Sequence, residues 1–170
     1  DSVKSRGLGD VYKRQISLVG ARLDDLVLKQ YGQTVEVNSE RIHLLHPSGA
    51  PKSYFAEFGW VGGSDSPNLP GPTTIWSSDG KQLTPGQPVT LSWDNGAGLK
   101  FERTYSLDEG YMVTVTQKVI NTGETPTALF PYGLISRSGT PDTLGFYILH
   151  EGPLGVFDGT LREYDYDDVQ

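Results

Sequence analysis

Cysteine is absent from the 170 residues of this chain, and so are long runs of apolar side chains. Without cysteine, a disulfide framework, a thiol nucleophile and a cysteine-ligated zinc site are all excluded. No stretch reaches the roughly 18 apolar residues that a helix needs to cross a bilayer, and none resembles the apolar region of a signal peptide. The residues present therefore predict no membrane-spanning segment.

Basic residues are scarce relative to acidic ones. The chain has 14 Lys and Arg against 21 Asp and Glu, which gives a net charge of −7 at pH 7. Affinity for phosphate backbones or for anionic lipid headgroups requires clustered positive charge. We therefore expect neither nucleic acid nor a lipid surface to be a direct partner.

Glycine and proline, in contrast, are abundant, with 21 and 11 copies, which is typical of a turn-rich β-protein. The length fits a single domain. Residues 1–15 differ from the rest, because they carry four basic residues, show no hydrophobic period and begin without methionine. We expect them to be a non-native or disordered leader, with a native basic tail as the alternative, and we expect residues 16–170 to form the domain.

Alternation of apolar and polar side chains is clearest between residues 89 and 121. In residues 99–107 the apolar side chains fall on one face of a strand, namely Leu99, Phe101, Tyr105 and Leu107. Residues 111–121 continue the alternation after a turn at 108–110, so the two runs predict an antiparallel hairpin. Residues 89–93 alternate in the same way before Asn95-Gly96, a pair that favours a tight hairpin turn.

The rest of the chain predicts shorter strands and one conflict. The strands are expected at 53–61, 73–76, 127–137, 145–149, 154–157 and 160–164, the last two joined through Asp158-Gly159. Pro131 and Gly133 mark an edge, bulge or bend, because proline cannot donate to a ladder. Residues 62–72 predict a long surface loop. Residues 21–31 conflict with an all-β chain, since their apolar side chains have a helical period.

The histidines are the first candidates for acid and base chemistry. His150 and Glu151 are neighbours at a predicted strand end, where successive side chains point to opposite faces, so we expect no shared proton. His43 and His46 have a spacing that would place two metal ligands on one face of a helix. Pro47 disfavours a helix there, and in an extended segment the two rings would lie on opposite faces. No metal or cofactor is therefore expected.

Other patterns carry less chemistry. The spacings of phosphate-binding loops and of a serine nucleophile elbow are absent from the sequence. Asp165, Asp167 and Asp168 lack the central glycine and closing glutamate of a calcium loop, so we interpret them as an acidic strand end. Among the tryptophans, Trp93 alternates with core residues, whereas Trp60 and Trp76 flank the breaker-rich loop and stay open to a role in sugar stacking.

The chain resembles one known family in several segments, taken in their order and spacing. The segments are ISLVGARLDDLVLKQY (16–31), SGAPKSYFAEFGW (48–60), LTPGQPVTLSWDNGAGLKFERTYSLDEGYMVTVTQKVIN (83–121), PYGLISRSGTP (131–141) and FYILHEGPLGVFDGTL (146–161). Together they are similar to the large periplasmic domain of the YidC membrane insertases of Gram-negative bacteria. The resemblance covers about residues 16 to 168.

The resemblance implies an all-β fold, a β-supersandwich related to galactose mutarotases, of which residues 16–170 would be a truncated N-terminal part. It also implies two short strands bent at Gly20, and we take this expectation over the helical period of residues 21–31. The insertase activity of the family resides elsewhere, in a membrane-embedded bundle with a positively charged side chain in a hydrophilic groove. No insertase residue is therefore transferred to this chain.

The function that the resemblance implies is that of a non-catalytic domain at the bacterial inner membrane, facing the periplasm. The implied partners are auxiliary subunits of the Sec translocon and nascent membrane proteins, whose insertion and folding the family assists. Two alternatives stay open. One is a mutarotase-like aldose epimerase that would use His43, His46, His150 and Glu151. The other is a carbohydrate-binding module that would stack sugars on Trp60 or Trp76.

Overall fold

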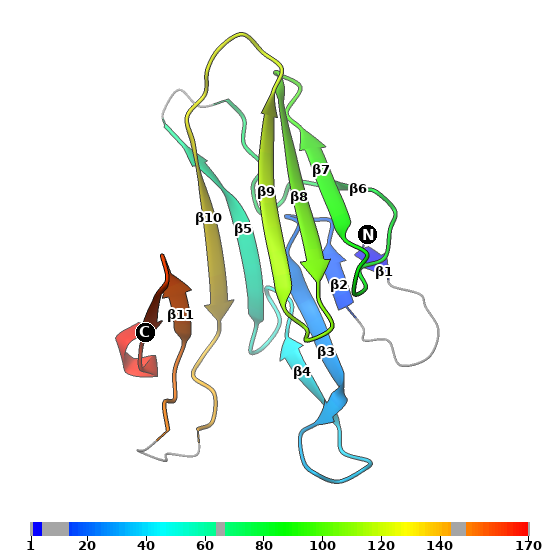
Figure 1. Ribbon diagram of the computed structural model, residues 1–170, viewed down its shortest axis with the longest axis vertical. Coiled ribbons are helices and arrows are strands. Elements are labelled where there is room, and N and C mark those ends of the chain that lie inside the picture. Colours follow the sequence, from blue (N-terminus) through cyan, green and yellow to red (C-terminus); the bar gives the residue numbers. More distant parts are fainter. Residues whose placement is uncertain (1, 5–13, 64–66, 144–148, 170) are drawn as a thin grey trace. The chain divides into compact units, whose positions relative to one another are not determined.

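A computed structural model describes residues 2–4, 14–63, 67–143 and 149–169 of the chain (Figure 1). The chain divides into two compact units, Asp1–Arg137 and Ser138–Gln170. The first unit contains two antiparallel sheets and the second contains a hairpin. The predicted all-β class is confirmed, whereas the relation to galactose mutarotases stays a prediction.

The larger sheet of the first unit has six strands. They are β1 (Ser2–Lys4), β2 (Arg14–Ser17), β3 (Leu23–Gly32), β4 (Arg41–Leu45), β5 (Tyr54–Gly62) and β10 (Leu129–Arg137). The order along the sheet is β1-β2-β3-β5-β10, and β4 pairs with β3 outside this path. The segments 2–4 and 14–15, which fall within the predicted leader, pair with the sheet, as Val3 lies opposite Ile16.

The smaller sheet has four strands in the order β6-β7-β8-β9. They are β6 (Ser77–Ser78), β7 (Val89–Asp94), β8 (Leu99–Leu107) and β9 (Val113–Asn121). The hairpin predicted for residues 99–121 is confirmed, with Phe101 opposite Val119 and Tyr105 opposite Val115. Burial alternates strictly along β8, so every second side chain of this strand enters the core.

The two sheets of the first unit enclose one hydrophobic core. Its buried members come from both sheets and from the loops between them, namely Ile16, Ala21, Leu23, Leu45, Trp60, Trp76, Leu83, Val89, Leu91, Leu99, Phe101, Tyr105 and Leu107. In Figure 1 the strands β7, β8 and β9 lie in front of β3 and β5. This packing of sheet on sheet is a sandwich.

The helical period of residues 21–31 is misleading, because this segment is strand β3. Gly20 and Ala21 have positive φ angles of 72° and 49°, and they turn the chain between β2 and β3. A Cβ at Gly20 would lie 2.6 Å from the carbonyl oxygen of Pro72, so the close approach of this loop also requires glycine. Pairing of β3 with β2, β4 and β5 therefore overrides the local period, as the resemblance implied.

Two other predicted strands have different outcomes. Residues 73–76 form no strand, and only Ile75 makes an isolated bridge, with Val19. The strand predicted at 145–149 falls almost wholly outside the described residues. The predicted loop is confirmed in its described part, since β5 ends at Gly62 and residues 67–71 have no regular structure.

Strand β10 lies at the end of the six-stranded sheet, beyond β5. Pro131 is within it, opposite Trp60, and an edge is where a sheet tolerates a residue without an N–H. Next to it, the Tyr132 ring covers Gly59 on β5, leaving no room for a Cβ there. The edge predicted from Pro131 and Gly133 is thus confirmed.

The second unit contains β11 (Leu154–Phe157), β12 (Thr160–Glu163) and the 3-10 helix η1 (Tyr166–Val169). Asp158 and Gly159 both have positive φ, 50° and 77°, which is the geometry of a tight two-residue hairpin turn. The predicted hairpin is confirmed. No side chain among the described residues of this unit, 138–143 and 149–169, is fully buried.

Candidate functional site

The most unusual group of the first unit is a buried arginine between the two sheets. Arg103 on β8 is only 1% exposed. Its Nη1 atom donates hydrogen bonds to the carbonyl oxygens of Gly20 at 3.2 Å and Ala21 at 2.8 Å, and its Nη2 atom donates to the carbonyl oxygen of Phe58. A guanidinium has enough donors in one plane to bind several carbonyls at once. Arg103 therefore fastens β8 to the opposite sheet.

Two tryptophans pack against this guanidinium. The Arg103 Cζ atom lies 4.9 Å from the ring centre of Trp76 and 5.6 Å from that of Trp60. The two indoles stack on each other, with centroids 6.4 Å apart and an angle of 21° between their planes. A cation over an indole face is stabilised by the ring quadrupole, more so where water is excluded. The buried charge is thus compensated by carbonyls and rings.

The sugar-stacking role that the sequence left open for Trp60 and Trp76 is not favoured, because both side chains are buried. They are 7% and 2% exposed, so neither presents a ring face to solvent. Trp93 is half-buried and packs against the core, its ring centre 5.7 Å from that of Phe101. The observation that favoured a carbohydrate-binding module is therefore lost.

Tyr105 completes the contact with the turn at Gly20 and Ala21. Its hydroxyl donates to the carbonyl oxygen of Ala21 at 2.6 Å. Burial raises the pKa of the Tyr105 phenol, and the neighbouring Arg103 lowers it only in part. The phenol thus stays protonated and serves as a hydrogen-bond donor.

Asp24 is a buried carboxylate near the same group, 8% exposed. Burial raises the pKa of Asp24, since the charged form loses solvation, while the charge of Arg22 lowers it in part. The folded pKa therefore lies above the unfolded value of 3.8. The stability that this group contributes is full below the unfolded pKa and is lost as the pH rises through the folded pKa.

Replacement of Asp24 by asparagine is therefore expected to raise the urea midpoint of unfolding at neutral pH. The gain should shrink near pH 4, at about the value where an aspartate carboxyl takes up its proton. Urea titrations at the two pH values measure it, with Asp94→Asn at the exposed end of β7 as the control. An equal gain at both pH values would show that charge is not the cause.

A polar cluster lies between β5 and β10. The Tyr132 hydroxyl donates to Glu57 Oε1 at 3.1 Å, and Arg22 Nη1 lies 3.7 Å from Glu57 Oε2. Burial, and next the charge of Glu57, raise the pKa of Tyr132. These groups join the two strands in the same way as a cross-strand ion pair.

The histidines are arranged differently from the prediction. The rings of His43 and His46 stack, with centroids 5.6 Å apart and an angle of 11°, so they lie on the same side of the chain. The pairing explains this, because Leu26 is opposite Leu45 while Val27 is opposite His43, which leaves Leu44 as the extra residue of a bulge. In the described residues, neither ring is paired with a carboxylate, and no group of three potential ligands is placed to hold a metal.

The remaining candidates lie in the second unit. His150 Nδ1 is 3.9 Å from Asp165 Oδ1, a carboxylate that is 79% exposed. Glu151 is half-buried. Asp167 and Asp168 lie in the first turn of η1, and the N–H of Asp165 donates to Asp168 Oδ2 at 3.3 Å. The predicted acidic strand end is thus a capped 3-10 turn.

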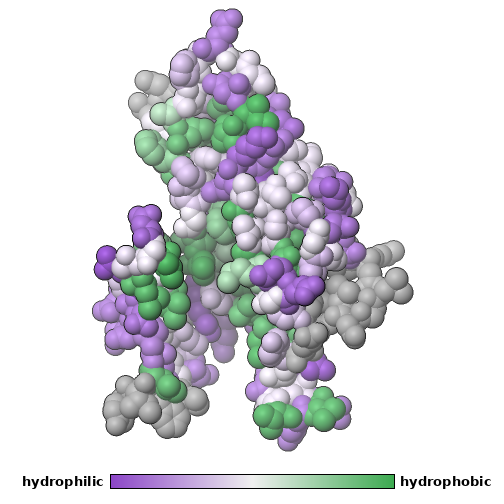
Figure 2. All heavy atoms as spheres, viewed as in Figure 1, coloured by the Kyte–Doolittle hydropathy of each residue, from purple (hydrophilic) through white to green (hydrophobic). Residues whose placement is uncertain are grey.

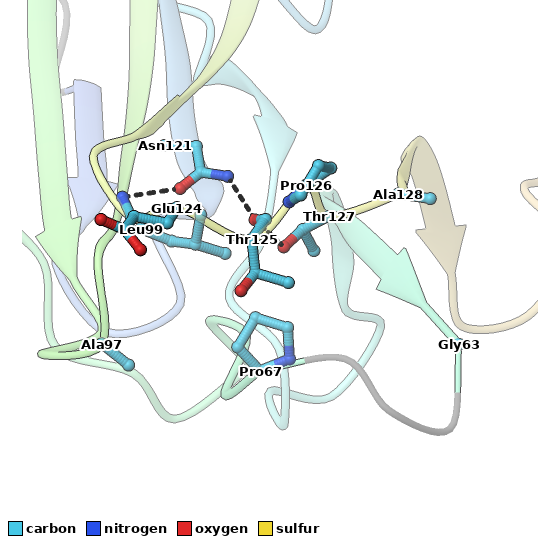
Figure 3. Close-up of a pocket in the computed structure, with 11 residues that line it drawn as sticks. Gly63, Pro67, Ala97, Leu99, Asn121, Glu124, Thr125, Pro126, Thr127 and Ala128 are labelled. Atoms are coloured by element: carbon cyan, nitrogen blue, oxygen red, sulfur yellow. Dashed lines mark hydrogen bonds between the residues drawn. The ribbon is translucent and has the colours of Figure 1, made fainter.

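The first unit has a cleft of about 650 Å³ where β8 and β9 meet the β9–β10 loop (Figure 3). The loop residues 123–128 form one wall, with Ala97, Leu99, Asn121, Gly63 and Pro67 around them. Asn121 braces this wall, since its Nδ2 donates to Thr125 O at 2.9 Å and its Oδ1 accepts from Gly123 N at 2.9 Å. Among the described residues that line the cleft, Glu124 is the one titratable side chain.

A smaller cavity of about 270 Å³ shares Leu99, Asn121 and Thr127 with this cleft and reaches Trp60. Its other walls are apolar, formed by Val119, Leu129 and Pro131. The described lining, made of backbone, amide, hydroxyl and apolar groups with one carboxylate, can bind a ligand, but these residues do not bring an acid and a base together.

Comparison with known proteins places this architecture in a family. A sequence model described as the YidC periplasmic domain matches residues 9–170. The chain belongs to this YidC periplasmic domain family. The resemblance found in the sequence is thereby confirmed, and the six- and four-stranded sheets are those of a member of the YidC periplasmic domain family.

Relatives named membrane protein insertase YidC are about half identical to the chain. That of Methylorubrum extorquens (strain PA1) is 52% identical over 155 residues, 91% of this chain and 25% of the relative. Those of Methylobacterium nodulans and Acidiphilium cryptum are 50% and 48% identical, covering 93% and 91% of this chain and 26% of each relative. The chain therefore spans about a quarter of the length of these curated YidC relatives. Within its described residues, no helix is long and apolar enough to span a bilayer.

Sequence reasoning missed the central group of this YidC domain. The core-facing residues of β8 were identified as Leu99, Phe101, Tyr105 and Leu107. Arg103 lies between Phe101 and Tyr105 and faces the same side of the strand. A charged residue at an odd position of that strand was the available signal. The role of Arg103 is structural, since its guanidinium donates to backbone carbonyls.

Proposed function

We propose that this chain is a non-catalytic domain of a bacterial inner-membrane protein insertase and that it faces the periplasm. The observation that carries the proposal is the match of residues 9–170 to the YidC periplasmic domain, together with insertase relatives of about 50% identity. In this role the domain assists the insertion and folding of membrane proteins, alone or with the Sec translocon. Its partners are nascent membrane proteins and auxiliary Sec subunits.

The site geometry supports binding rather than catalysis. The buried guanidinium of Arg103 is occupied by backbone carbonyls and rings, so it has no open face for a substrate. His43 and His46 contact each other rather than an acid. The cleft beside Asn121 offers hydroxyl, amide and apolar groups, which suit an extended polypeptide better than a reacting bond.

A chimera tests the proposal in the full-length protein. Residues 16–170 would replace the 155 matched residues of the Methylorubrum extorquens insertase. A photo-cross-linking residue at Ala97, in the cleft, is expected to react with newly made membrane proteins during their insertion. The matched control carries the cross-linker at Thr116, on the exposed face of β9. A chimera that accumulates in the membrane but gives no cross-link from Ala97, or equal ones from both positions, would contradict the proposed role.

A further inference from the structure

Residues 31–41, which comprise the loop between β3 and β4 and the strand residues beside it, carry two highly exposed valines. Val35 and Val37 have relative exposures of 104% and 89%, and Tyr31 at the base of the loop is 51% exposed. In the view of Figure 2, hydrophobic side chains are visible at the tip of this loop. Single exposed apolar residues are common, whereas several on one projecting segment mark an interaction site.

Internal hydrogen bonds hold the loop in one shape. The N–H of Gln33 donates to Glu40 O at 2.9 Å, the N–H of Thr34 donates to Ser39 Oγ at 2.9 Å, and the N–H of Ser39 donates to Glu36 O at 3.0 Å. These bonds join the two arms of the loop on either side of the valines. The exposure of the valines is therefore built into the loop.

The base of the loop is fixed to the second sheet of the same unit. The ring of Tyr31 meets that of Tyr111, beyond β8, edge to face, with centroids 6.4 Å apart. Such aromatic pairs stabilise a contact beyond the area that they bury. We name residues 31–41 the finger loop, since this anchored base lets its tip project.

Charge around the finger loop selects its partner. Glu36 and Glu40 are exposed beside the valines, and Asp108 and Glu109 are exposed in the turn next to Tyr111, against the exposed Arg41. Among the side chains described around this loop, these four carboxylates outnumber the one guanidinium, so they repel anionic lipid and also a second copy of a chain whose net charge is −7. They attract a partner that offers positive charge beside apolar side chains.

We propose that the finger loop is a docking site for a polypeptide segment whose apolar side chains are flanked by Lys or Arg. The apolar side chains contact Val35 and Val37, and the basic ones pair with Glu36 and Glu40. The inference goes beyond the proposed insertase role and does not depend on it, because it rests on this loop alone. The cleft beside Asn121 and the finger loop are separate sites.

Peptide binding to the whole chain tests the docking site. The probe is a fluorescent peptide of about 14 residues made of leucine and lysine, and its twin has glutamate in place of lysine. Fluorescence anisotropy is expected to show saturable binding of the lysine peptide that weakens as salt is added. The glutamate peptide should not bind. Absence of binding by the lysine peptide would overturn the proposal.

Matched variants distinguish binding at the finger loop from non-specific binding elsewhere on the surface. The double changes Val35→Ser with Val37→Ser, and Glu36→Lys with Glu40→Lys, should each weaken binding at least tenfold. The control changes are Val61→Ser with Ile75→Ser, which are 54% and 72% exposed, and Asp142→Lys with Glu163→Lys at exposed positions of the second unit. Controls that weaken binding as much as the finger variants would contradict the proposal, as would variants that leave it unchanged.

Two further readouts distinguish other occupants of the finger loop. Flotation with vesicles containing anionic phospholipid should show no association that depends on Val35 and Val37. Sedimentation should likewise show no self-association that the Val35→Ser and Val37→Ser changes abolish. If the valine variant lost an association with vesicles, the partner of the finger loop would be a membrane surface and not a peptide. If it lost self-association, the partner would be a second copy of the chain. Unfolding midpoints of all variants should match the parent, since every changed side chain is exposed.

Discussion

The Arg103→Ala variant is expected to lose about 3 to 5 kcal/mol of unfolding free energy, because a buried carbonyl left without a donor costs about 1 to 3 kcal/mol. The carbonyl oxygens of Gly20 and Phe58 lose this donor, and that of Ala21 keeps only the hydroxyl of Tyr105. The cavity left beside Trp76 adds to the cost. Urea titration followed by tryptophan fluorescence measures the effect, because the two buried indoles lie next to the change.

Two companion variants make this result interpretable. Arg103→Lys should recover only a small part of the stability, since one ammonium cannot match the planar donor set of a guanidinium. Arg162→Ala, at an exposed position of β12, should change the free energy of unfolding by less than about 0.5 kcal/mol. If the Arg103→Ala chain were as stable as the Arg162→Ala chain, the carbonyls would have found other donors. The inference that Arg103 stabilises the contact between the two sheets would then be wrong.

The Trp76→Ala variant is expected to have the second large effect. Trp76 is 2% exposed, stacks on Trp60 and lies over the guanidinium of Arg103, so its removal leaves a large cavity beside a buried charge. Truncation of a buried tryptophan costs about 3 to 5 kcal/mol. In a chain of this size that corresponds to a fall in Tm of roughly 6 to 20 °C.

Differential scanning calorimetry of Trp76→Ala beside Trp93→Ala provides the comparison. Trp93 is half-buried, so its truncation should lower Tm by clearly less than that of Trp76. Equal falls in Tm would indicate that the burial of a tryptophan side chain does not determine how much it contributes to stability. A Trp76→Ala chain that kept the Tm of the parent but lost heat of binding to a glycan would restore the sugar-stacking role that the burial of Trp76 contradicts.

Strands β7, β8 and β9 of the smaller sheet could be predicted because their signals are local. In β8 burial alternates over all nine residues and in β9 over the first seven, and the turn between them is short. Asp158-Gly159 likewise determines its hairpin through the φ angles that these two residues tolerate. In contrast, β3 has a helical period, and what makes it a strand is its pairing with segments up to more than 30 residues away.

The site could be predicted less well, since it depends on contacts across the sandwich. The sequence places Trp76 beside a run of turn residues, and only the packing of β8 against β5 makes it a core side chain. The facing of His43 and His46 depends on a bulge at Leu44 that the alternation of residue types does not reveal. The burial of Arg103 could have been predicted from its odd position in β8, which it shares with the apolar residues. Its buried position shows that a charged residue in an apolar register can belong to the core.

The bonds of Arg103 also constrain the order in which the molecule can be completed. They join residues 82 and 83 positions apart along the chain, so the carbonyls of Gly20 and Ala21 leave the ribosome long before their donor. At usual synthesis rates of 5 to 20 residues per second, the interval is roughly 4 to 16 s. During that time β2 and β3 can pair only with each other and with nearby strands. The contact between the sheets therefore forms only after β8 has been made, and the six-stranded sheet is completed later still, because β10 follows β8 in the chain.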